Sequence, residues 1–408
     1  MAISVFVGEG CNRPRDILVI AATGTALAHP KWFQVLWRQQ SSMMRRKVHA
    51  LSIGPKFCDR KTSRGGLPSG CGWQAGQWAI ARQARIDGKD VTDVAGDDLD
   101  PEIRSFAAEM ARSYARYPAL DQVPLSEARQ IAEKVRLPWR QGGPVMHQSE
   151  DLHLPTPHGP VRVRIHRPNP SPQLPALIYL HGGGWTIFSI DSHDRLMREY
   201  AARAQIAVVG VDYALSPEAK YPVALEQVLA IARLLAREPS RFGLKPERLA
   251  LGGDSAGGNL ALSAALKLKA SGESILHTLL LLYGVFTKEI SAESARRYGG
   301  PDYMLTTAEM DQFWSNYLPA NAVSDDPYAT PLGAPLGGLP STFLLAGACD
   351  ILSEQSLFLA ERLKAAGVKT ELRIYAGATH SFLEAVSRSR LADQALAESA
   401  AFLSTELA

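Results

Sequence analysis

The sequence predicts an α/β fold in which helices cover both faces of a mostly parallel central sheet. Short, continuously apolar runs, such as "ALIYL" at 176–180 and "TFLLAGA" at 342–348, alternate with segments of helical periodicity. Strands that are apolar on both faces and joined by helix-length connections belong to parallel sheets buried on both sides. Ligands of such sheets bind at the carboxyl ends of the strands. Residues that directly follow these runs are therefore the first candidates for a site.

The chain of 408 residues exceeds the usual size of one domain, and we divide it into three parts. We expect a basic N-terminal extension over residues 1–99, a helical cap segment over 100–143 and the α/β domain over 144–408, with 286–330 as a second segment that the cap recruits. Hydrophobic residues make up 46% of the chain and charged residues 21%, and no apolar run is long enough to cross a bilayer. This composition excludes an integral membrane protein.

The N-terminal extension differs from the rest of the chain in charge. Residues 1–95 contain 14 Lys and Arg against 6 Asp and Glu, whereas the whole chain contains 44 against 41. The basic run at 43–61 can attract phosphate or anionic lipid, but no nucleic-acid-binding module accompanies it, so no nucleic-acid partner is expected. A nucleic-acid or membrane-surface role for the extension is the weaker alternative.

Two further features of the extension bear on its location. Three of the four cysteines lie there without a Cys-x-x-Cys pair, which argues against a zinc site and favours a reducing compartment. Arginines precede an apolar run that ends in Ala26-Leu27-Ala28, which resembles an export signal in part. Asp16 abuts that run and Thr23 to Thr25 interrupt it, so we expect a cytoplasmic protein rather than an exported one.

Helices are expected ahead of the sheet. Asp100 can cap the helix that Pro101 begins, and apolar residues then recur at helical spacing up to Pro118. A second helical run begins at Ser126 and is expected to stop near Pro138. The two helices are read as a lid or as plain packing helices. The alternating stretch "VRVRIHRP" at 161–168 then predicts a half-exposed strand.

The stretch "LALGGDSAGGNLAL" at 249–262 places one serine among four glycines, between a predicted strand and a predicted helix. A serine presented at so tight a turn needs neighbours without Cβ atoms, and Gly253 and Gly257 lie two residues to either side. Gly258 would let the helix approach the sheet. A phosphate-binding loop is the competing interpretation, but no lysine follows the glycines. Ser255 is therefore the candidate nucleophile.

A serine hydroxyl needs a base and an acid that orients the base. Of the ten histidines, His380 follows the strand "ELRIY" through a loop of small residues, whereas His277 lies within an apolar run and is expected in the core. Asp350 follows "TFLLAGAC" and is the candidate acid, although it is also placed to cap the next helix. Both roles can hold together. The chain order is nucleophile, acid, base.

Negative charge on a tetrahedral intermediate requires amide donors. The motif "HGGGW" at 181–185 ends the strand "ALIYL", and its consecutive glycines can turn their N–H groups towards one point. We expect the N–H groups of Gly183, Gly184 and Ala256 to form this oxyanion hole. A merely flexible loop is the alternative.

Together "HGGGW", "GDSAGGN", "YALSPEAKYP", "CDIL" and "HSF" resemble the bacterial hormone-sensitive-lipase-like esterases, an α/β-hydrolase family. The resemblance covers the chain from about Asp100 to the C-terminus. It implies a carboxylesterase with a helical cap that hydrolyses short acyl esters, without a metal or organic cofactor. Carried over by position, it makes Ser255, Asp350 and His380 the catalytic triad.

The resemblance also implies the oxyanion hole named above and admits a homodimer formed through an edge strand. Three positions depart from the family pattern. Ile351 stands where proline is usual, Ser381 where glycine is common, and Gly284 follows Tyr283 where the family often has proline. Trp185 and Phe188 are the candidate substrate-binding residues for a small-molecule ester, and an aromatic pocket would favour compact acyl groups. The alternatives are a non-catalytic small-ligand receptor on the same fold, and an amidase or lipase with the same triad.

Overall fold

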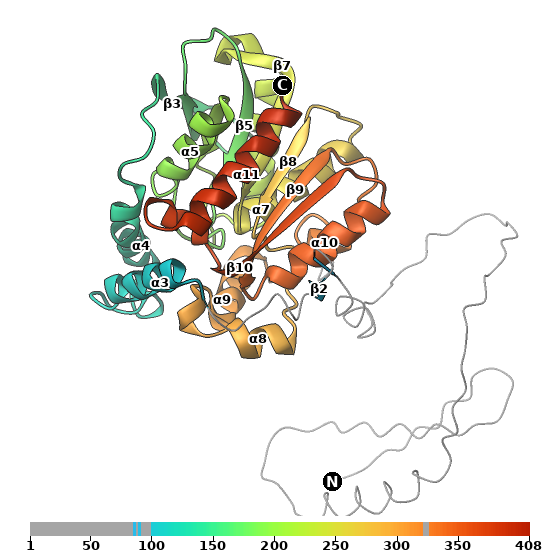
Figure 1. The fold of residues 1–408 in the computed structure, drawn as a ribbon. Helices are drawn as coiled ribbons and strands as arrows, with labels where there is room; N and C mark the ends of the chain where they lie inside the picture. Colours follow the sequence, from blue (N-terminus) through green and yellow to red (C-terminus); the bar gives the residue numbers. More distant parts are fainter. Residues whose placement is uncertain (1–84, 87–88, 91–98, 321–325) are drawn as a thin grey trace, which may run out of the picture. The chain divides into compact units, whose positions relative to one another are not determined.

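The computed structural model describes residues 85–86, 89–90, 99–320 and 326–408 (Figure 1). Strands β1 (Arg85–Ile86) and β2 (Lys89–Asp90) form a short antiparallel pair. The expectations for the charge, cysteines and export signal of the N-terminal extension lie outside the described residues.

A single large sheet organises the described part of the chain. Its strand order is β10-β9-β8-β7-β5-β6-β4-β3; neighbours from β10 to β6 are parallel, and β4 and β3 are antiparallel. The strands are β3 (Gln148–Leu154), β4 (Val161–Arg167), β5 (Leu174–Leu180), β6 (Ala207–Val211), β7 (Leu244–Asp254), β8 (Thr278–Leu282), β9 (Ser341–Cys349) and β10 (Thr370–Thr379). The predicted fold class is confirmed.

Helices cover both faces of the sheet, and the side chains of each strand alternate between two hydrophobic clusters. In β5, Ile178 and Leu180 face the cluster with α6, α7 and α10, whereas Leu177 and Tyr179 face the cluster with α5 and α11 (Figure 1). The helices are α3 (Pro101–Tyr114), α4 (Leu125–Arg140), α5 (Asp194–Ala204), α6 (Val223–Arg237), α7 (Ala256–Ala270), α8 (Ala292–Tyr298), α9 (Thr307–Tyr317), α10 (Ser353–Ala365) and α11 (Arg390–Glu406).

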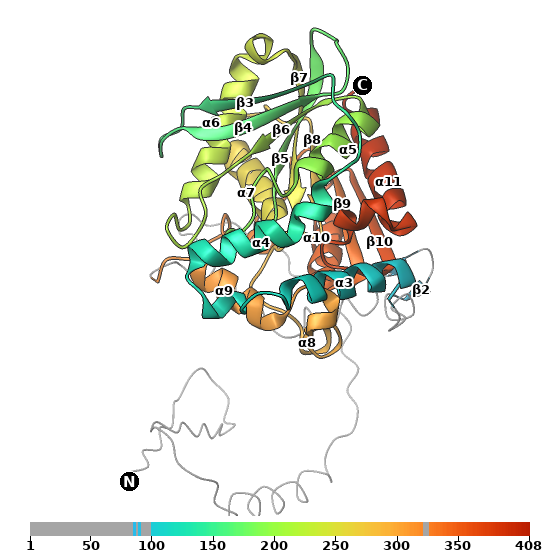
Figure 2. The same cartoon turned by 90° about the vertical axis from the view of Figure 1, so that its left-hand side faces the viewer.

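Helices α3, α4, α8 and α9 lie together at one end of the α/β domain in both views (Figure 2). The cap of Asp100 on α3 is present, because its Oδ1 accepts from the N–H groups of Glu102 at 2.9 Å and Ile103 at 3.1 Å. Short 3₁₀ turns complete the connections: η2 (Leu120–Gln122), η3 (Pro239–Phe242), η4 (Pro301–Tyr303), η5 (Pro331–Gly333) and η6 (Phe382–Ser387). Among the described residues, no helix has both the length and the apolarity to span a membrane.

The end of the second helix near Pro138 is confirmed, whereas the expected burial of His277 was wrong. Helix α4 continues through Pro138 to Arg140, because Trp139 in its last turn is buried edge-on against Phe106, with ring centroids 4.6 Å apart. That packing offsets the one helix hydrogen bond that proline removes. His277 is exposed and precedes β8, since its N–H bonds Leu249 at the amino end of the sheet rather than within the core.

Candidate active site

Ser255 lies at the turn between β7 and α7, at the carboxyl end of the sheet. Its backbone has φ 53° and ψ −116°, a conformation that few residues other than glycine adopt, and the N–H group bonds the carbonyl of Leu282 at 2.9 Å. The strain is held by the strand on one side and the helix on the other. This turn presents the hydroxyl at the end of the sheet.

The flanking glycines are required because two backbone segments meet at the turn. A Cβ atom added at Gly253 or at Gly257 would collide with the same group, the carbonyl oxygen of Leu180 at the end of β5. A Cβ at Gly258 would lie 3.1 Å from the Cα of Gly284. The expectation that these glycines make room for strand and helix is confirmed.

Gly257→Ala is expected to lower the free energy of unfolding by about 3 kcal/mol, the upper part of the range for overpacking, because the obstacle is backbone and cannot rotate away. Urea denaturation followed by circular dichroism measures the loss. The matched control is Gly300→Ala, which places its Cβ in open space and should change stability by less than about 0.5 kcal/mol. Equal stability of the two variants would contradict the expectation.

The structure brings the three predicted side chains together from the ends of three strands. The Oγ of Ser255 lies 2.9 Å from Nε2 of His380, and Nδ1 of His380 lies 2.8 Å from Oδ2 of Asp350. All three residues are buried. Oδ1 of Asp350 accepts from the N–H of Leu352 at 2.9 Å, so this carboxylate both orients the imidazole and bonds the first turn before α10.

The charge on His380 is set by its neighbours. Burial lowers the pKa of the imidazole, but the carboxylate of Asp350 and the hydrogen bond to it raise the pKa, and the net value lies above the ordinary 6.5. The ring of Tyr283 packs edge-on against the imidazole, with ring centroids 5.1 Å apart.

Ser381 directly follows His380, at a position where the family that the sequence resembles commonly has glycine. Its φ of 56° lies in the left-handed region that favours glycine.

The three expected oxyanion donors have free amides. Gly183 and Gly184 have φ values of 106° and 56°, and a Cβ at either position would collide with neighbouring atoms. Ala256 is the first residue of α7, where an amide has no partner within the helix. Among the described residues, none of these three N–H groups has a hydrogen-bond acceptor. They are therefore available to a ligand.

Asp254 is a buried residue of the site that the sequence analysis missed. Its Oδ1 accepts from the N–H of Gly182 at 3.0 Å and from the hydroxyl of Tyr179 at 2.8 Å, and its Oδ2 lies 3.3 Å from Nε2 of His193. Burial raises the pKa of Asp254, but His193 outweighs it and the net pKa is lowered. The carboxylate thus fixes the start of the glycine loop. Its position directly before the candidate nucleophile Ser255 is the sequence feature that could have identified it.

The aromatic candidates take different positions. Trp185 is fully buried and stacks on Tyr317 of α9, with ring centroids 4.1 Å apart. Phe188 has its ring beside Gly183, where an added Cβ would lie 2.8 Å from it, and the ring of Phe313 in α9 lies over Gly184. Their roles in substrate binding stay predictions. Phe313 lies in the segment 286–330, which was expected to join the cap without this residue being singled out.

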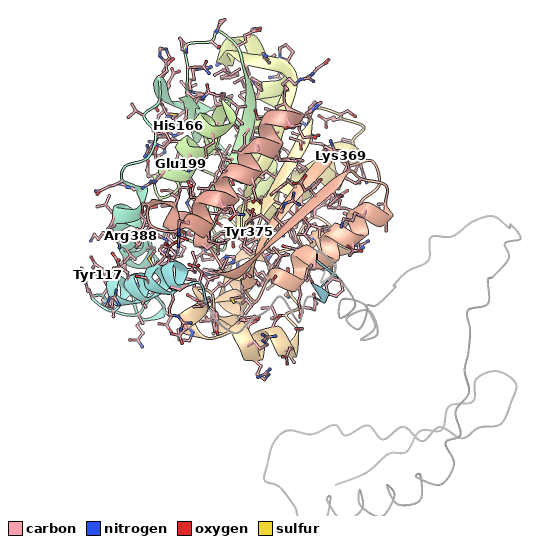
Figure 3. All side chains as sticks on the ribbon, viewed as in Figure 1. Tyr117, His166, Glu199, Lys369, Tyr375 and Arg388 are labelled. Carbon is pink, nitrogen blue, oxygen red and sulfur yellow. The ribbon has the colours of Figure 1, made fainter. Side chains whose placement is uncertain are left out.

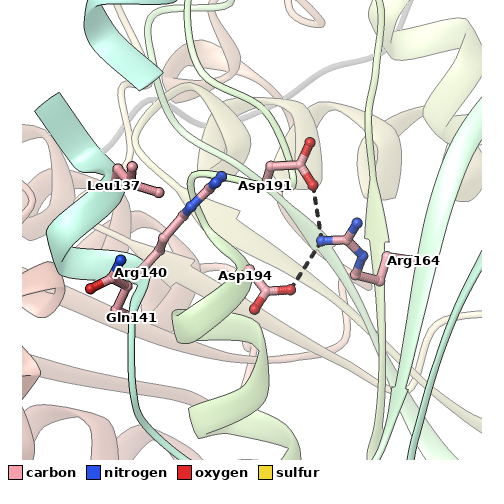
Figure 4. A pocket seen from close by; sticks show the side chains of 6 residues that line it. All are labelled: Leu137, Arg140, Gln141, Arg164, Asp191 and Asp194. Carbon is pink, nitrogen blue, oxygen red and sulfur yellow. Dashed lines mark hydrogen bonds and ion pairs between the residues drawn. The ribbon is translucent and has the colours of Figure 1, made fainter. Parts of the chain in front are cut away.

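A separate surface pocket of about 600 Å³ lies away from these residues (Figure 4). Arg164 pairs there with Asp191 and Asp194, each at 3.0 Å. None of the residues that line it belongs to the predicted site; they are Leu137, Arg140, Gln141, Arg164, Asp191 and Asp194.

A serine on a strand-to-helix turn of a mostly parallel sheet is an arrangement of hydrolases. The chain belongs to a family described as having the α/β hydrolase fold, whose model matches residues 177–384. An acetyl esterase of Salmonella choleraesuis (strain SC-B67) is 33% identical over 267 residues, 65% of this chain and 82% of the relative.

Solved structures agree with this assignment. A hyperthermophilic esterase from the archaeon Pyrobaculum calidifontis is 30% identical, with a TM-score of 0.71 over 76% of this chain and 100% of that one. A thermostable carboxylesterase cloned from a metagenomic library is 32% identical, with a TM-score of 0.68 over 70% of this chain and 98% of that one. The predicted likeness to hormone-sensitive-lipase-like esterases is confirmed, and the protein is a carboxylic ester hydrolase.

Proposed function

We propose that this enzyme is a serine carboxylesterase that hydrolyses short-chain acyl esters through an acyl-enzyme intermediate. Ser255 is the nucleophile, His380 the general base and Asp350 the residue that orients it. The observation that carries the proposal is the pair of contacts on one imidazole, 2.9 Å to the serine hydroxyl and 2.8 Å to the carboxylate.

In the first step, Nε2 of His380 takes the proton of Ser255 as Oγ attacks the ester carbonyl carbon. Asp350 accepts the Nδ1–H bond, which selects the tautomer whose Nε2 is free and stabilises the imidazolium that forms. The imidazolium then gives its proton to the leaving alcohol as the carbonyl–oxygen bond breaks. The acyl group remains on Ser255.

In the second step, His380 takes a proton from water, the hydroxide attacks the acyl carbon, and Ser255 leaves with the returned proton. Both tetrahedral intermediates place an oxyanion near the amides of Gly183, Gly184 and Ala256. Each such donor typically contributes about 2.7–4 kcal/mol to stabilising the transition state. The anchoring of Gly182 by Asp254 holds the first two donors in place.

The preference for short acyl groups is supported by the surroundings of the oxyanion amides. The ring of Phe313 lies over Gly184 and that of Phe188 beside Gly183, so the space next to the reacting carbonyl is limited by aromatic side chains. The name acetyl esterase, carried by several relatives, agrees with a compact acyl group. We also assign α3 and α4, with α8 and α9, to the cap.

A chain-length series tests this function. We expect kcat/KM for p-nitrophenyl esters to be highest for acetyl to butyryl groups and to fall by about tenfold or more towards palmitoyl, because the aromatic walls exclude long chains. p-Nitroacetanilide, the matching amide, should be hydrolysed far more slowly. A rate that rises with acyl length would indicate a lipase, comparable anilide cleavage an amidase, and binding without turnover a receptor.

A further inference from the structure

Arg136 of α4 and Glu384 of η6 form an ion pair that the proposed mechanism does not use. Nε of Arg136 lies 2.7 Å from Oε2 of Glu384, and the two side chains are only 7% and 10% exposed. Removing two charges from water costs several kcal/mol per ion, which good geometry only partly offsets. A pair of this kind is weak evidence for stability, so its position in the site needs another explanation.

Glu384 is joined to the catalytic base by a short, tight turn. Its N–H bonds the carbonyl of Ser381, the residue after His380, at 3.1 Å. Ser381 itself has φ 56°, so the backbone between His380 and η6 has little freedom. The position of Glu384 is therefore linked to that of His380 through a short, constrained backbone segment.

Arg136 also reaches the oxyanion loop. Its guanidinium carbon lies 4.8 Å from the ring centroid of Phe188, a cation–π contact, and that ring lies beside Gly183. A second aromatic ring, that of Tyr114 in α3, lies 5.9 Å away. One buried cation thus contacts the loop that carries the base and the loop that carries the oxyanion donors.

Other contacts fix α4 and η6 against the same loops. Arg129, two turns before Arg136, donates from Nε to the carbonyl of Thr186 at 2.8 Å, and Glu133 accepts from the hydroxyl of Ser189 at 2.6 Å. Arg388, which is labelled in Figure 3, follows η6. Its guanidinium lies 4.8 Å from the ring centroid of Trp139 in α4. Arg136 therefore stands on a helix that is anchored on either side of it.

From these contacts we propose that Arg136 and Glu384 are positioning residues, which couple the cap helix α4 to His380 and hold the imidazole in register with Ser255. The inference rests on the proposed function, since it gives His380 its role as base. It assigns to α4 a part in catalysis beyond covering the site.

The carboxylate of the pair also acts on the pKa of His380. Glu384 raises the pKa of the imidazole after the larger effects of burial and Asp350, and Arg136 is the cation that faces Glu384. The charged and titratable groups around the imidazole are Asp350 after β9, Asp254 and Ser255 at the end of β7, Tyr283 after β8, His193 before α5, Glu384 in η6 and Arg136 in α4.

The test compares Arg136→Met, Glu384→Gln and the double variant with the wild type, using p-nitrophenyl acetate and a pH series of kcat/KM. Each single variant should lower kcat by about tenfold to 10²-fold while KM changes less, because the reacting groups are displaced by a fraction of an ångström to an ångström. Glu384→Gln should move the acid limb to lower pH, because the carboxylate that raises the pKa of His380 is removed. The double variant leaves no unpaired buried charge, so it should fold and still lose kcat.

Lys134→Met is the matched control, since Lys134 is an exposed cation on the same helix, and it should behave as the wild type. Arg136→Lys, which keeps the charge, should leave the limb in place. Wild-type kcat in the double variant, or an acid limb that does not move to lower pH in Glu384→Gln, would overturn the inference. If Ser255→Ala is inactive in the same assay, a failure of these predictions concerns only the Arg136–Glu384 pair. An active Ser255→Ala enzyme would overturn the proposed function itself.

Discussion

Replacing Ser255 with alanine is expected to lower kcat for p-nitrophenyl acetate by about 10⁶-fold, the loss that follows removal of the nucleophile in serine proteases. In the proposed mechanism the hydroxyl is the group that attacks, and alanine at the strained turn at φ 53° offers no nucleophile. The remaining rate, about 10³–10⁴ above that in water, would come from the oxyanion donors and from binding. Steady-state kinetics measures the loss of kcat and the remaining rate. A stopped-flow experiment should show an acyl-enzyme burst in the wild type and none in the variant.

Ser263→Ala is the matched control for this substitution. Ser263 is fully buried two turns further along α7, and its Oγ has no partner among the described residues. The control should keep near-normal kcat, and both variants should unfold at similar urea concentrations. Equal hydrolysis by the wild type and the Ser255→Ala protein, freed of contaminating esterase, would refute the assignment of the nucleophile.

Asp350→Asn is expected to lower kcat by about 10⁴-fold, because an amide in this position donates to Nδ1 and fixes the wrong tautomer of His380. The carboxylate bonds Nδ1 at 2.8 Å and is almost fully buried, so no water can replace it. Asp393→Asn, a change of an exposed carboxylate on α11, serves as the control and should leave the rate unchanged.

The same substitution should change the pH dependence. The base must be neutral to act, and its pKa in the wild type lies above 6.5, so the acid limb of kcat/KM should lie above that value. Burial lowers this pKa and Asp350 raises it. Removing the carboxylate therefore moves the limb to lower pH. Near-normal rates and an unmoved limb would show that another carboxylate orients His380.

The sequence predicted the fold and the three converging side chains because both follow from local patterns. Continuous apolar runs identify strands buried on both faces, and Ser255 and Asp350 each follow such a run, whereas His380 follows the edge strand β10. In a parallel sheet the carboxyl ends of these strands share one edge. The glycines around Ser255 predicted the tight turn because that turn, too, is determined by residues that are neighbours in the sequence.

What the sequence could not predict depends on contacts between distant segments. Arg136 looks like any cation of an amphipathic helix, and only the fold brings Glu384 to it. Trp185 follows the glycines of the "HGGGW" motif and was a candidate for contact with the substrate. Its indole is instead fully buried against α9. Propensity places the end of α4 near Pro138, whereas the buried Trp139 carries its last turn past that proline. In each case tertiary burial, which has no periodic signature, decides the outcome.

The ring that lies over Gly184 belongs to α9 and not to the sheet. Lys220 holds the end of that helix by donating to the carbonyls of Ser315 and Asn316. In the proposed mechanism, the acyl-binding space and the nucleophile turn are thus built from separate parts of the chain. We therefore expect that substitutions in α9 change the substrate range of this esterase while its chemistry is left intact.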